Sequence, residues 1–431
     1  MVATIIICAV TCLLMILSVL FFPKIKIGKF KIDTYWVITL LGAIILLISG
    51  LADINSVWSN MTSDTAINPL KILVLFICMT GLSIFLDEVG FFKYLANATL
   101  KKAKNGQIKL FIYLYLIVSI LTVFTSNDVI VLSFTPFICY FAKNAKINPI
   151  PFLAGEFVAA NTWSMTLIIG NPTNIYLASS AGIDFISYLK VMALPTLMAG
   201  GIAFLLLFLL FRKQLSKPIE PTYEDIKIED KPLLIIGLTI LIICTLLLAI
   251  GSYINLEMWL VTLISFASLI IITLIICLCR KQKPTILLNS LKRLPYELIP
   301  FILSMFVMII ALNDAGISKA IGDFFGVEFA TFKYGFASFF ASNIINNIPM
   351  SVLFSSILSS QGANLPAIFA TIVGSNFGAF FSPIGALAGI MWSNMLNEHG
   401  LKFGYLSFLK IGVTIAIPTL VVALLGLLIV L

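Results

Sequence analysis

The chain has 431 residues, of which 60% are hydrophobic and only 11% are charged, and its formal net charge is +8 at pH 7. A water-soluble chain of this length cannot bury so much apolar surface, so the composition excludes a soluble protein and predicts a polytopic membrane protein. The positive charges lie in short loops between apolar runs, which indicates membrane topology and not contact with nucleic acid.

In chain order, apolar runs of about the length of a membrane span, ~20 residues, occur at 3–22, 34–52, 71–86, 187–211, 233–251, 258–279, 298–313 and 404–430. Two longer runs, 152–180 and 364–397, are each interrupted by a cluster of Gly, Pro and Asn residues. Such clusters break a helix, so both runs are predicted to be discontinuous helices. The sequence therefore predicts ten crossings, with five in each half.

Two further segments, 108–142 and 331–358, are divided by polar tips at Ser126-Asn127-Asp128 and Asn346-Asn347. At least one arm of each is short for a span, so re-entrant hairpins are expected, because backbone at membrane depth must be buried in protein or line a cavity. An amphipathic stretch precedes each hairpin, at 89–104 and 315–326. These two stretches are predicted to be interfacial arm helices.

The loop charges predict the topology. Assigning residues 23–33, 87–109, 143–151, 212–232, 280–297 and 398–410 to one side places 23 of the 27 Lys and Arg residues there. The positive-inside rule makes that side cytoplasmic, in a protein of the cell membrane with both termini outside. The predicted class is all-α, with two inverted five-span repeats, 1–211 and 233–431, joined by a cytoplasmic connector at 212–232.

Polar residues recur in the same order in both halves, at the hairpin tips and at the breaks of the discontinuous helices. Helix N-termini, amide groups and unwound carbonyls at such places can bind a small polar solute, an oxyanion or a sodium ion at the tips. The alternative is that these side chains only satisfy broken backbone. The candidate binding residues are Ser126, Asn127, Asp128, Asn161, Gly170, Asn171, Thr173, Asn174, Asn346, Asn347, Ser375, Asn376, Ser382 and Gly385.

Asp128 and Glu156 are the candidate coupling residues. A carboxyl group at bilayer depth with no cation nearby in sequence favours its uncharged form, so Asp128 is expected to carry a proton. The alternative for Asp128 is a helix cap at the tip. Glu156 lies one turn into a span. Its side chain could extend to the membrane interface, and this explanation is at least as good as a role in coupling.

No enzymatic or cofactor motif accompanies these residues. The sequence contains no nucleotide-binding loop and no nucleophile–base arrangement, and its seven cysteines lie in apolar runs without metal-site spacing. We therefore expect neither an enzyme nor a bound metal or cofactor.

The chain resembles the arsenite permease family, the membrane subunit of arsenical pumps, in Leu86 to Phe92, Ser126 to Pro136, Gly170 to Ala178, Asn346 to Pro349 and Ser382 to Trp392. That family belongs to the ion-transporter superfamily of sodium–dicarboxylate symporters and the P protein. The resemblance implies scaffold and transport domains, binding roles for the tip and break residues, and an elevator-like or rocking movement. The acids that the family often carries before each break correspond here to Asn161 and Asn376, which leaves Asp128 as the main titratable candidate.

The expected function is proton-coupled efflux of arsenite or antimonite by a secondary transporter. One alternative is sodium- or proton-coupled transport of a small anion such as a dicarboxylate, and another is sodium/proton exchange. A conduit driven by a separate soluble ATPase subunit is a further alternative that the chain leaves open. A neutral trihydroxy solute needs hydrogen-bond donors and acceptors but no counter-charge, and Asn-rich tips supply both.

Overall fold

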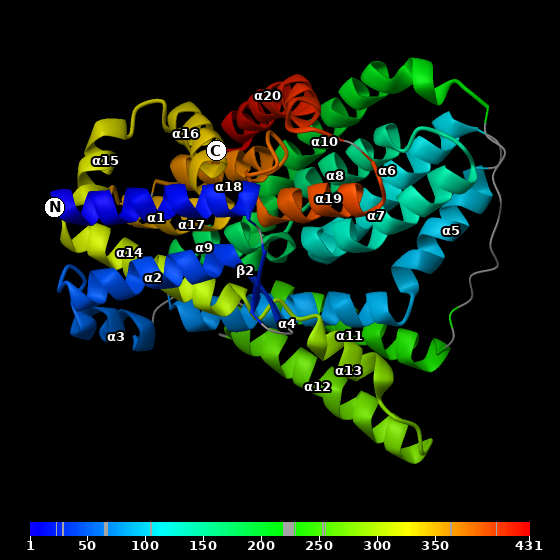
Figure 1. The fold of residues 1–431 in the computed structure, drawn as a ribbon, viewed down its shortest axis with the longest axis horizontal. Helices are drawn as coiled ribbons and strands as arrows, with labels where there is room; N and C mark the ends of the chain where they lie inside the picture. Colours follow the sequence, from blue (N-terminus) through cyan, green and yellow to red (C-terminus); the bar gives the residue numbers. More distant parts are fainter. Residues whose placement is uncertain are drawn as a thin grey trace.

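The computed structural model describes residues 1–22, 24–27, 30–63, 68–103, 106–218, 228, 230–251, 254, 256–362, 364–401 and 403–431. These residues are almost entirely helical, which confirms the predicted helical class (Figure 1). The greater part of the 212–232 connector lies outside the described residues, so the boundary between the two predicted halves stays a prediction.

The first half contains ten α-helices and one short 3-10 helix among the described residues: α1 (Val2–Phe21), α2 (Thr34–Ile48), α3 (Ile54–Thr62), α4 (Pro69–Glu88), α5 (Phe91–Ala103), α6 (Gln107–Phe124), α7 (Asn127–Asn144), α8 (Ile150–Trp163), η1 (Ile168–Gly170), α9 (Pro172–Ser180) and α10 (Phe185–Leu215). Helices α6 and α7 form the predicted first hairpin, and α8 and α9 are the two parts of the first broken helix. Asn127 and Asp128 belong to the first turn of α7 and not to the non-helical tip.

The second half follows the same order: α11 (Lys231–Gly251), α12 (Met258–Cys279), α13 (Thr285–Lys292), α14 (Leu298–Asp314), α15 (Ile317–Phe325), α16 (Ala330–Ile345), α17 (Asn347–Ser360), α18 (Leu365–Gly378), α19 (Leu387–Glu398) and α20 (Tyr405–Val430). Helices whose labels differ by ten occupy the same place in their halves. The short helices α3 and α13 were not predicted, because each is a single amphipathic stretch beside a loop.

The same packing pairs occur in both halves. In the first half, α6 packs on α8 and α8 packs on α10; in the second half, α16 packs on α18 and α18 packs on α20. Between the halves, α2 packs on α14, and correspondingly α12 packs on α4. The two halves also contact each other, because α7 packs on α19 as well as on α8, and α17 packs on α9 as well as on α18. The broken helices and hairpins of both halves therefore lie together in the interior, and α10 packs along α20 beside them (Figure 1).

Six described helices are long and apolar enough to cross a membrane, or seven if α14 and α15 count as one bent span, so the protein is a multi-pass membrane protein. Helix α6 is one of the six, so this arm of the first hairpin is not too short to cross. The arms of the second hairpin have 16 and 14 residues. At a rise of about 1.5 Å per residue, both are shorter than a hydrocarbon core of ~30 Å. Ten crossings remain a prediction.

The predicted arm helices are present as α5 and α15. The chain bends by 76° between α14 and α15. Gly316 at this bend has a φ of 74°, a left-handed conformation that glycine adopts without steric cost. The bend turns the amphipathic helix α15 away from the direction of the span α14.

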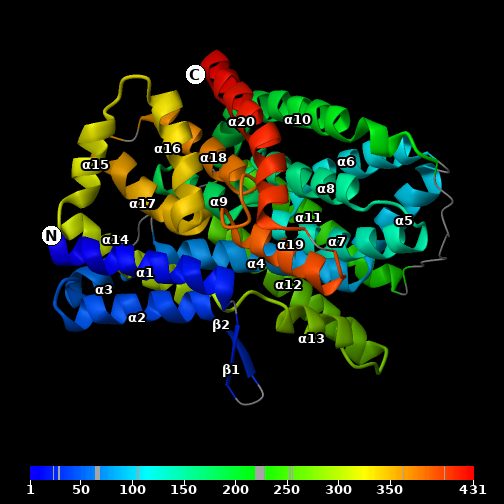
Figure 2. The same ribbon diagram turned by 45° about the horizontal axis from the view of Figure 1, so that its top comes forward.

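One segment departs from the all-α prediction. In the stretch expected to be a loop, β1 (Lys24–Ile27) pairs antiparallel with β2 (Phe30–Asp33). Alternating Lys and Ile residues over Lys24–Ile27 give the two-residue period of a strand, a signal that the search for apolar spans overlooked. Figure 2 shows the hairpin projecting away from the helices.

Candidate functional site

The two broken helices are joined by a buried network of amide side chains. Asn376 of α18 donates from Nδ2 to Asn174 Oδ1 at 2.7 Å and to the Ile372 carbonyl oxygen at 2.9 Å. Its Oδ1 accepts from Ser164 Oγ at 3.0 Å and from Asn171 Nδ2 at 3.1 Å. All four hydrogen-bonding positions of this amide are used. The contact between residues some 200 positions apart holds the two breaks together.

Asn171 and Asn174 also stabilise the first break locally. Asn171 is the N-cap of α9, and its Oδ1 accepts from the backbone nitrogen of Thr173 at 3.2 Å and from Thr173 Oγ1 at 3.1 Å. Asn174 Nδ2 donates to the carbonyl oxygens of Ser164 at 2.9 Å and Leu167 at 3.3 Å. These bonds satisfy carbonyl groups that the helix break leaves open. The geometry of these residues therefore agrees with the structural alternative.

A glycine lies at a close backbone approach in each break. A side-chain carbon added to Gly170 would lie 2.1 Å from the Ser164 carbonyl oxygen, and one added to Gly385 would lie 2.0 Å from the Gly378 carbonyl oxygen. Both distances are far inside van der Waals contact, so both breaks depend on the missing Cβ. Gly170 and Gly385 shape the site through their backbones.

The tip of each hairpin packs against the broken helix of its own half. Asn127 Nδ2 donates to Asn161 Oδ1 of α8 at 3.2 Å. In the second half, Asn346 Nδ2 donates to the Ile384 carbonyl oxygen at 3.2 Å, and the Asn347 backbone nitrogen donates to Gly385 at 3.1 Å. The second tip thus meets the second break, whereas the first tip contacts α8 shortly before its break. No hydrogen bond between the described residues joins one tip to the other.

Three candidate residues and the neighbouring Thr162 each have a buried hydroxyl or amide oxygen without a hydrogen-bond partner in the described protein. These atoms are Ser126 Oγ, Asn127 Oδ1, Thr162 Oγ1 and Ser375 Oγ, and all lie in the first tip or one residue from Asn161 or Asn376. Buried polar atoms are nearly always hydrogen-bonded, so each such atom needs an explanation. These oxygens are free to accept hydrogen bonds from a polar solute or to coordinate a cation.

Asp128 opens into a cavity of about 290 Å³. The cavity runs between α4 and α7 and is closed on one side by Ile390, Met391 and Met395 of α19. Besides Asp128, the charged residues that line it are Lys24, Asp33, Arg293 and Glu297, which were not predicted from the sequence. Thr80, whose hydroxyl group has no hydrogen-bond partner among the described residues, also lines it. We refer to it as the Asp128 cavity. Since Ser126 is the N-cap and Asp128 follows two residues later, Asp128 is not the cap that the alternative reading expected.

The cations of the Asp128 cavity are already paired with acids. Lys24 Nζ lies 3.9 Å from Asp33 Oδ1, and Arg293 Nη2 lies 2.8 Å from Asp87 Oδ2 while its Nη1 contacts Glu88 at 2.5 Å. Arg293 thereby anchors the end of α4 to the loop before α14. Asp128 itself shares the cavity with these pairs, and no ion pair between the described residues includes it.

Glu156 does not reach the interface. Its side chain is 1% exposed, and both carboxylate oxygens lie 3.1 Å from Thr135 Oγ1 of α7. The interfacial explanation offered from the sequence is therefore wrong, because α7 covers this face of α8. Glu156 links hairpin one to the first broken helix and stays a candidate for coupling.

The remaining candidates are in the second half. Ser382 Oγ donates to Asn343 Oδ1 at 2.5 Å, and Asn343 Nδ2 donates to the Phe339 and Gly378 carbonyl oxygens at 2.9 Å and 3.2 Å. Asn343 was missed, although a polar residue one turn before the tip of an apolar arm was a usable signal. No group of three or more His, Cys, Asp or Glu residues in the described part of the chain is placed to hold a metal ion.

Asn346 holds a backbone conformation that suits glycine, with φ 72° and ψ 153°. We expect Asn346→Gly to be about 1 kcal/mol more stable than Asn346→Ala, because both lose the same amide contacts and only glycine relieves strain of ~1–3 kcal/mol, less its own entropy cost. Thermal unfolding of the purified variants in detergent measures this difference.

Asn60, exposed within α3, is the matched control, because there the order should reverse and Ala should be more stable than Gly. Equal stability of the two Asn346 variants would show that the tip relaxes without strain.

Comparison with known proteins gives a consistent result. The model of the citrate transporter family, CitMHS, matches residues 30–374. An arsenical pump membrane protein of Escherichia coli is 28% identical over 412 residues, covering 89% of this chain and 91% of that protein. A 46 kDa membrane protein of Mycobacterium leprae is 25% identical and covers 82% of this chain and 84% of its own length. These matches confirm the resemblance to arsenite permeases that the sequence motifs indicated.

Among solved structures, the YdaH transporter of Alcanivorax borkumensis has a similar fold, with a TM-score of 0.53 and 13% sequence identity. The similarity covers 99% of this chain and 96% of that one. At this identity the likeness concerns the fold alone.

Proposed function

The chain belongs to the citrate transporter family, and from that premise we propose that it is a secondary active transporter that exports arsenite or antimonite in exchange for protons. The observation that carries the proposal is the Asp128 cavity, into which a carboxyl group in the first turn of α7, next to Asn127, opens. Similarity to arsenical pump membrane proteins over nearly the full length supports this choice of solute.

The chemistry of the tip suits a neutral solute. Arsenous acid carries three hydroxyl groups and no charge near neutral pH, so it needs acceptors and donors but no counter-ion. Ser126 Oγ and Asn127 Oδ1 are buried without protein partners, and Asn127 directly precedes Asp128. In this scheme the solute binds at the tip while Asp128 is deprotonated, and a proton replaces it for the return step.

The predicted inverted topology supplies the second half of the cycle. The halves share their helix order and packing pairs, and 23 of the 27 Lys and Arg residues fall on the side assigned to the cytoplasm. On this assignment the Asp128 cavity, which Lys24 and Arg293 line, opens to the cytoplasm, where an exporter must collect its solute.

A second candidate is proton- or sodium-coupled transport of a small carboxylate anion. It is favoured by the description of the family and by the two cations, Lys24 and Arg293, that line the Asp128 cavity. Both cations are already paired with acids, so an anion would have to compete with Asp33, Asp87 and Glu88. This competition is the reason for placing the neutral solute first.

Uptake into everted membrane vesicles tests the proposal. The everted face presents the cytoplasmic side, and arsenite, citrate and succinate are compared under an imposed pH gradient or an imposed sodium gradient. We expect arsenite accumulation that depends on the pH gradient and vanishes when an uncoupler dissipates it. Accumulation of citrate or succinate without arsenite would establish the second candidate instead, and membranes without the protein give the background.

A further inference from the structure

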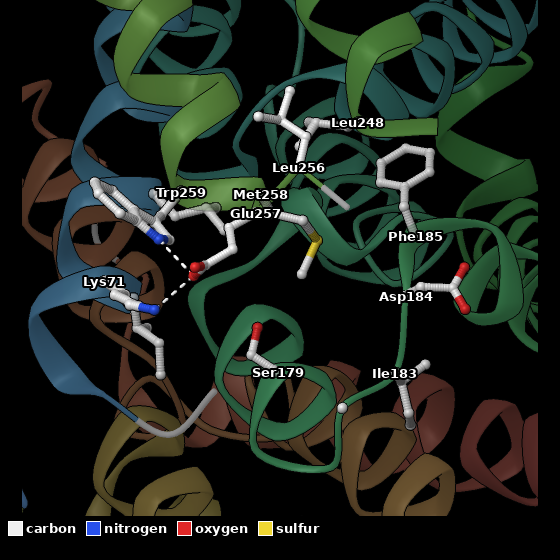
Figure 3. A pocket seen from close by; sticks show the side chains of 13 residues that line it. Lys71, Ser179, Ile183, Asp184, Phe185, Leu248, Leu256, Glu257, Met258 and Trp259 are labelled. Atoms are coloured by element: carbon white, nitrogen blue, oxygen red, sulfur yellow. Dashed lines mark hydrogen bonds and ion pairs between the residues drawn. The ribbon is translucent and has the colours of Figure 1, made fainter. Parts of the chain in front are cut away.

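A second cavity, of about 210 Å³, lies between the start of α4, the end of α9, the start of α10 and the loop before α12. Figure 3 shows Lys71 and Trp259 both directed at Glu257 on one wall, with Ile183 and Phe185 on the opposite wall. Lys71 Nζ and Trp259 Nε1 donate to the same Glu257 oxygen, Oε2, at 2.6 Å and 2.7 Å. We refer to this second cavity as the Glu257 cavity.

The Glu257 cavity and the Asp128 cavity occupy corresponding places in the two halves. Glu257 is the N-cap of α12 and Trp259 its second residue, as Asp33 is the N-cap of α2 and Tyr35 its second residue. Asp33 and Tyr35 line the Asp128 cavity. The start of α4 lines one cavity and the start of α14 the other, and the last turns of α9 and α19 correspond in the same way.

The two cavities differ in depth. The Asp128 cavity reaches Asp128 and Val129 in the first turn of α7, whereas the lining of the Glu257 cavity contains no residue of α17, the corresponding arm. Helix α9 packs on α17, and its Tyr176 is buried. The cavity therefore reaches the second helix of the hairpin in the first half, and the corresponding cavity does not reach it in the second half.

We propose that the Glu257 cavity is the outer vestibule through which the solute leaves, an inference that rests on the proposed transport function and topology. In the alternate state, α9 and the start of α10 move away from α4 and α12, and the vestibule extends to Asn347, which begins α17 as Asn127 begins α7. Helix α4 packs on α12, and the Lys71–Glu257 pair ties them together, so these helices form the stationary wall.

The moving wall offers a position that reports this change. Ser179, in the last turn of α9, lines the Glu257 cavity and is 9% exposed. The neighbouring Ser180 is half-buried and is not among the cavity's lining residues, so it is a matched control on the same helix. Replacing either serine by cysteine changes one atom of the side chain.

Labelling intact cells with a charged, membrane-impermeant methanethiosulfonate tests the proposal, with modification read from the mass of the purified protein. A pH gradient and a sodium gradient are imposed in turn. We expect Ser179→Cys to react severalfold faster under the gradient that drives transport than without a gradient. We also expect the modified protein to lose transport. Ser180→Cys should react at a rate independent of either gradient, and the unmodified chain with its seven native cysteines gives the labelling blank.

Labelling of Ser179→Cys that is insensitive to both gradients, or that occurs only from the cytoplasmic side, would overturn the vestibule. The result does not depend on the identity of the solute, because labelling is measured on the protein. Absence of arsenite transport by the unmodified chain would reject the proposed solute and leave a gradient-dependent labelling result intact.

Discussion

Asp128→Asn is expected to abolish concentrative transport while retaining downhill exchange of the solute. The amide has the shape of the protonated carboxyl group and still faces the Asp128 cavity, so the site keeps its form. It cannot release a proton, so it cannot couple one. Each proton exchanged across about one pH unit supplies ~1.4 kcal/mol and sustains about a tenfold solute gradient. The variant should therefore fall from that ratio to about one.

The measurement is arsenite accumulation in everted vesicles, with solute exchange at zero gradient as the test of intact binding. Asp323→Asn, in the exposed helix α15, is the matched control and should accumulate arsenite normally. If Asp128→Asn concentrates the solute with an unchanged pH dependence, the proton carrier lies elsewhere. Glu156, buried against Thr135, is then the next position to replace.

Asn376→Ala is expected to have the largest effect on stability. The substitution leaves Asn174 Oδ1 without its donor and Asn171 Nδ2 without its acceptor in a buried site. A cost of about 2–6 kcal/mol follows, since each buried polar group left unpaired costs roughly 1–3 kcal/mol. The two broken helices also lose the hydrogen bonds between their polar breaks, so transport should be lost together with stability.

Thermal unfolding in detergent and the yield of monodisperse protein measure this effect. Asn289→Ala, on the exposed face of α13, makes the same change without a buried partner and should unfold like the unmodified chain. A stable Asn376→Ala variant that has lost transport would instead assign Asn376 to solute binding. A stable and active variant would show that the amide network is dispensable.

Some features of this protein follow from local sequence. Composition alone determined that it is a multi-pass membrane protein, because no soluble fold can bury so many apolar side chains. The helix breaks before Asn171-Pro172 and around Ser382-Pro383 were predictable, because proline and glycine disrupt a helix whatever surrounds it. The twofold recurrence of the helix order was equally visible, since it is written twice along the chain.

Other features depend on contacts between distant residues. The sequence placed Asn376 near a break, but only the tertiary structure paired it with Asn171 and Asn174. Reaching the interface was one of two explanations for Glu156 from the sequence, and helix α7 covers this side chain instead. Lys24 and Arg293 lie far from Asp128 in sequence yet line the same cavity, because β1, α7 and the loop before α14 converge there.

The division has a physical reason. Solvent class, helix breaks and turns depend on the intrinsic properties of a few neighbouring residues, so they can be determined from the sequence. The partner of a buried polar group is chosen by which helices pack together, and in a chain that is apolar on nearly every helix face the hydrophobic pattern leaves that choice open. The packing of α7 on both α8 and α19 is such a choice, and it sets the surroundings of Asp128 and Glu156.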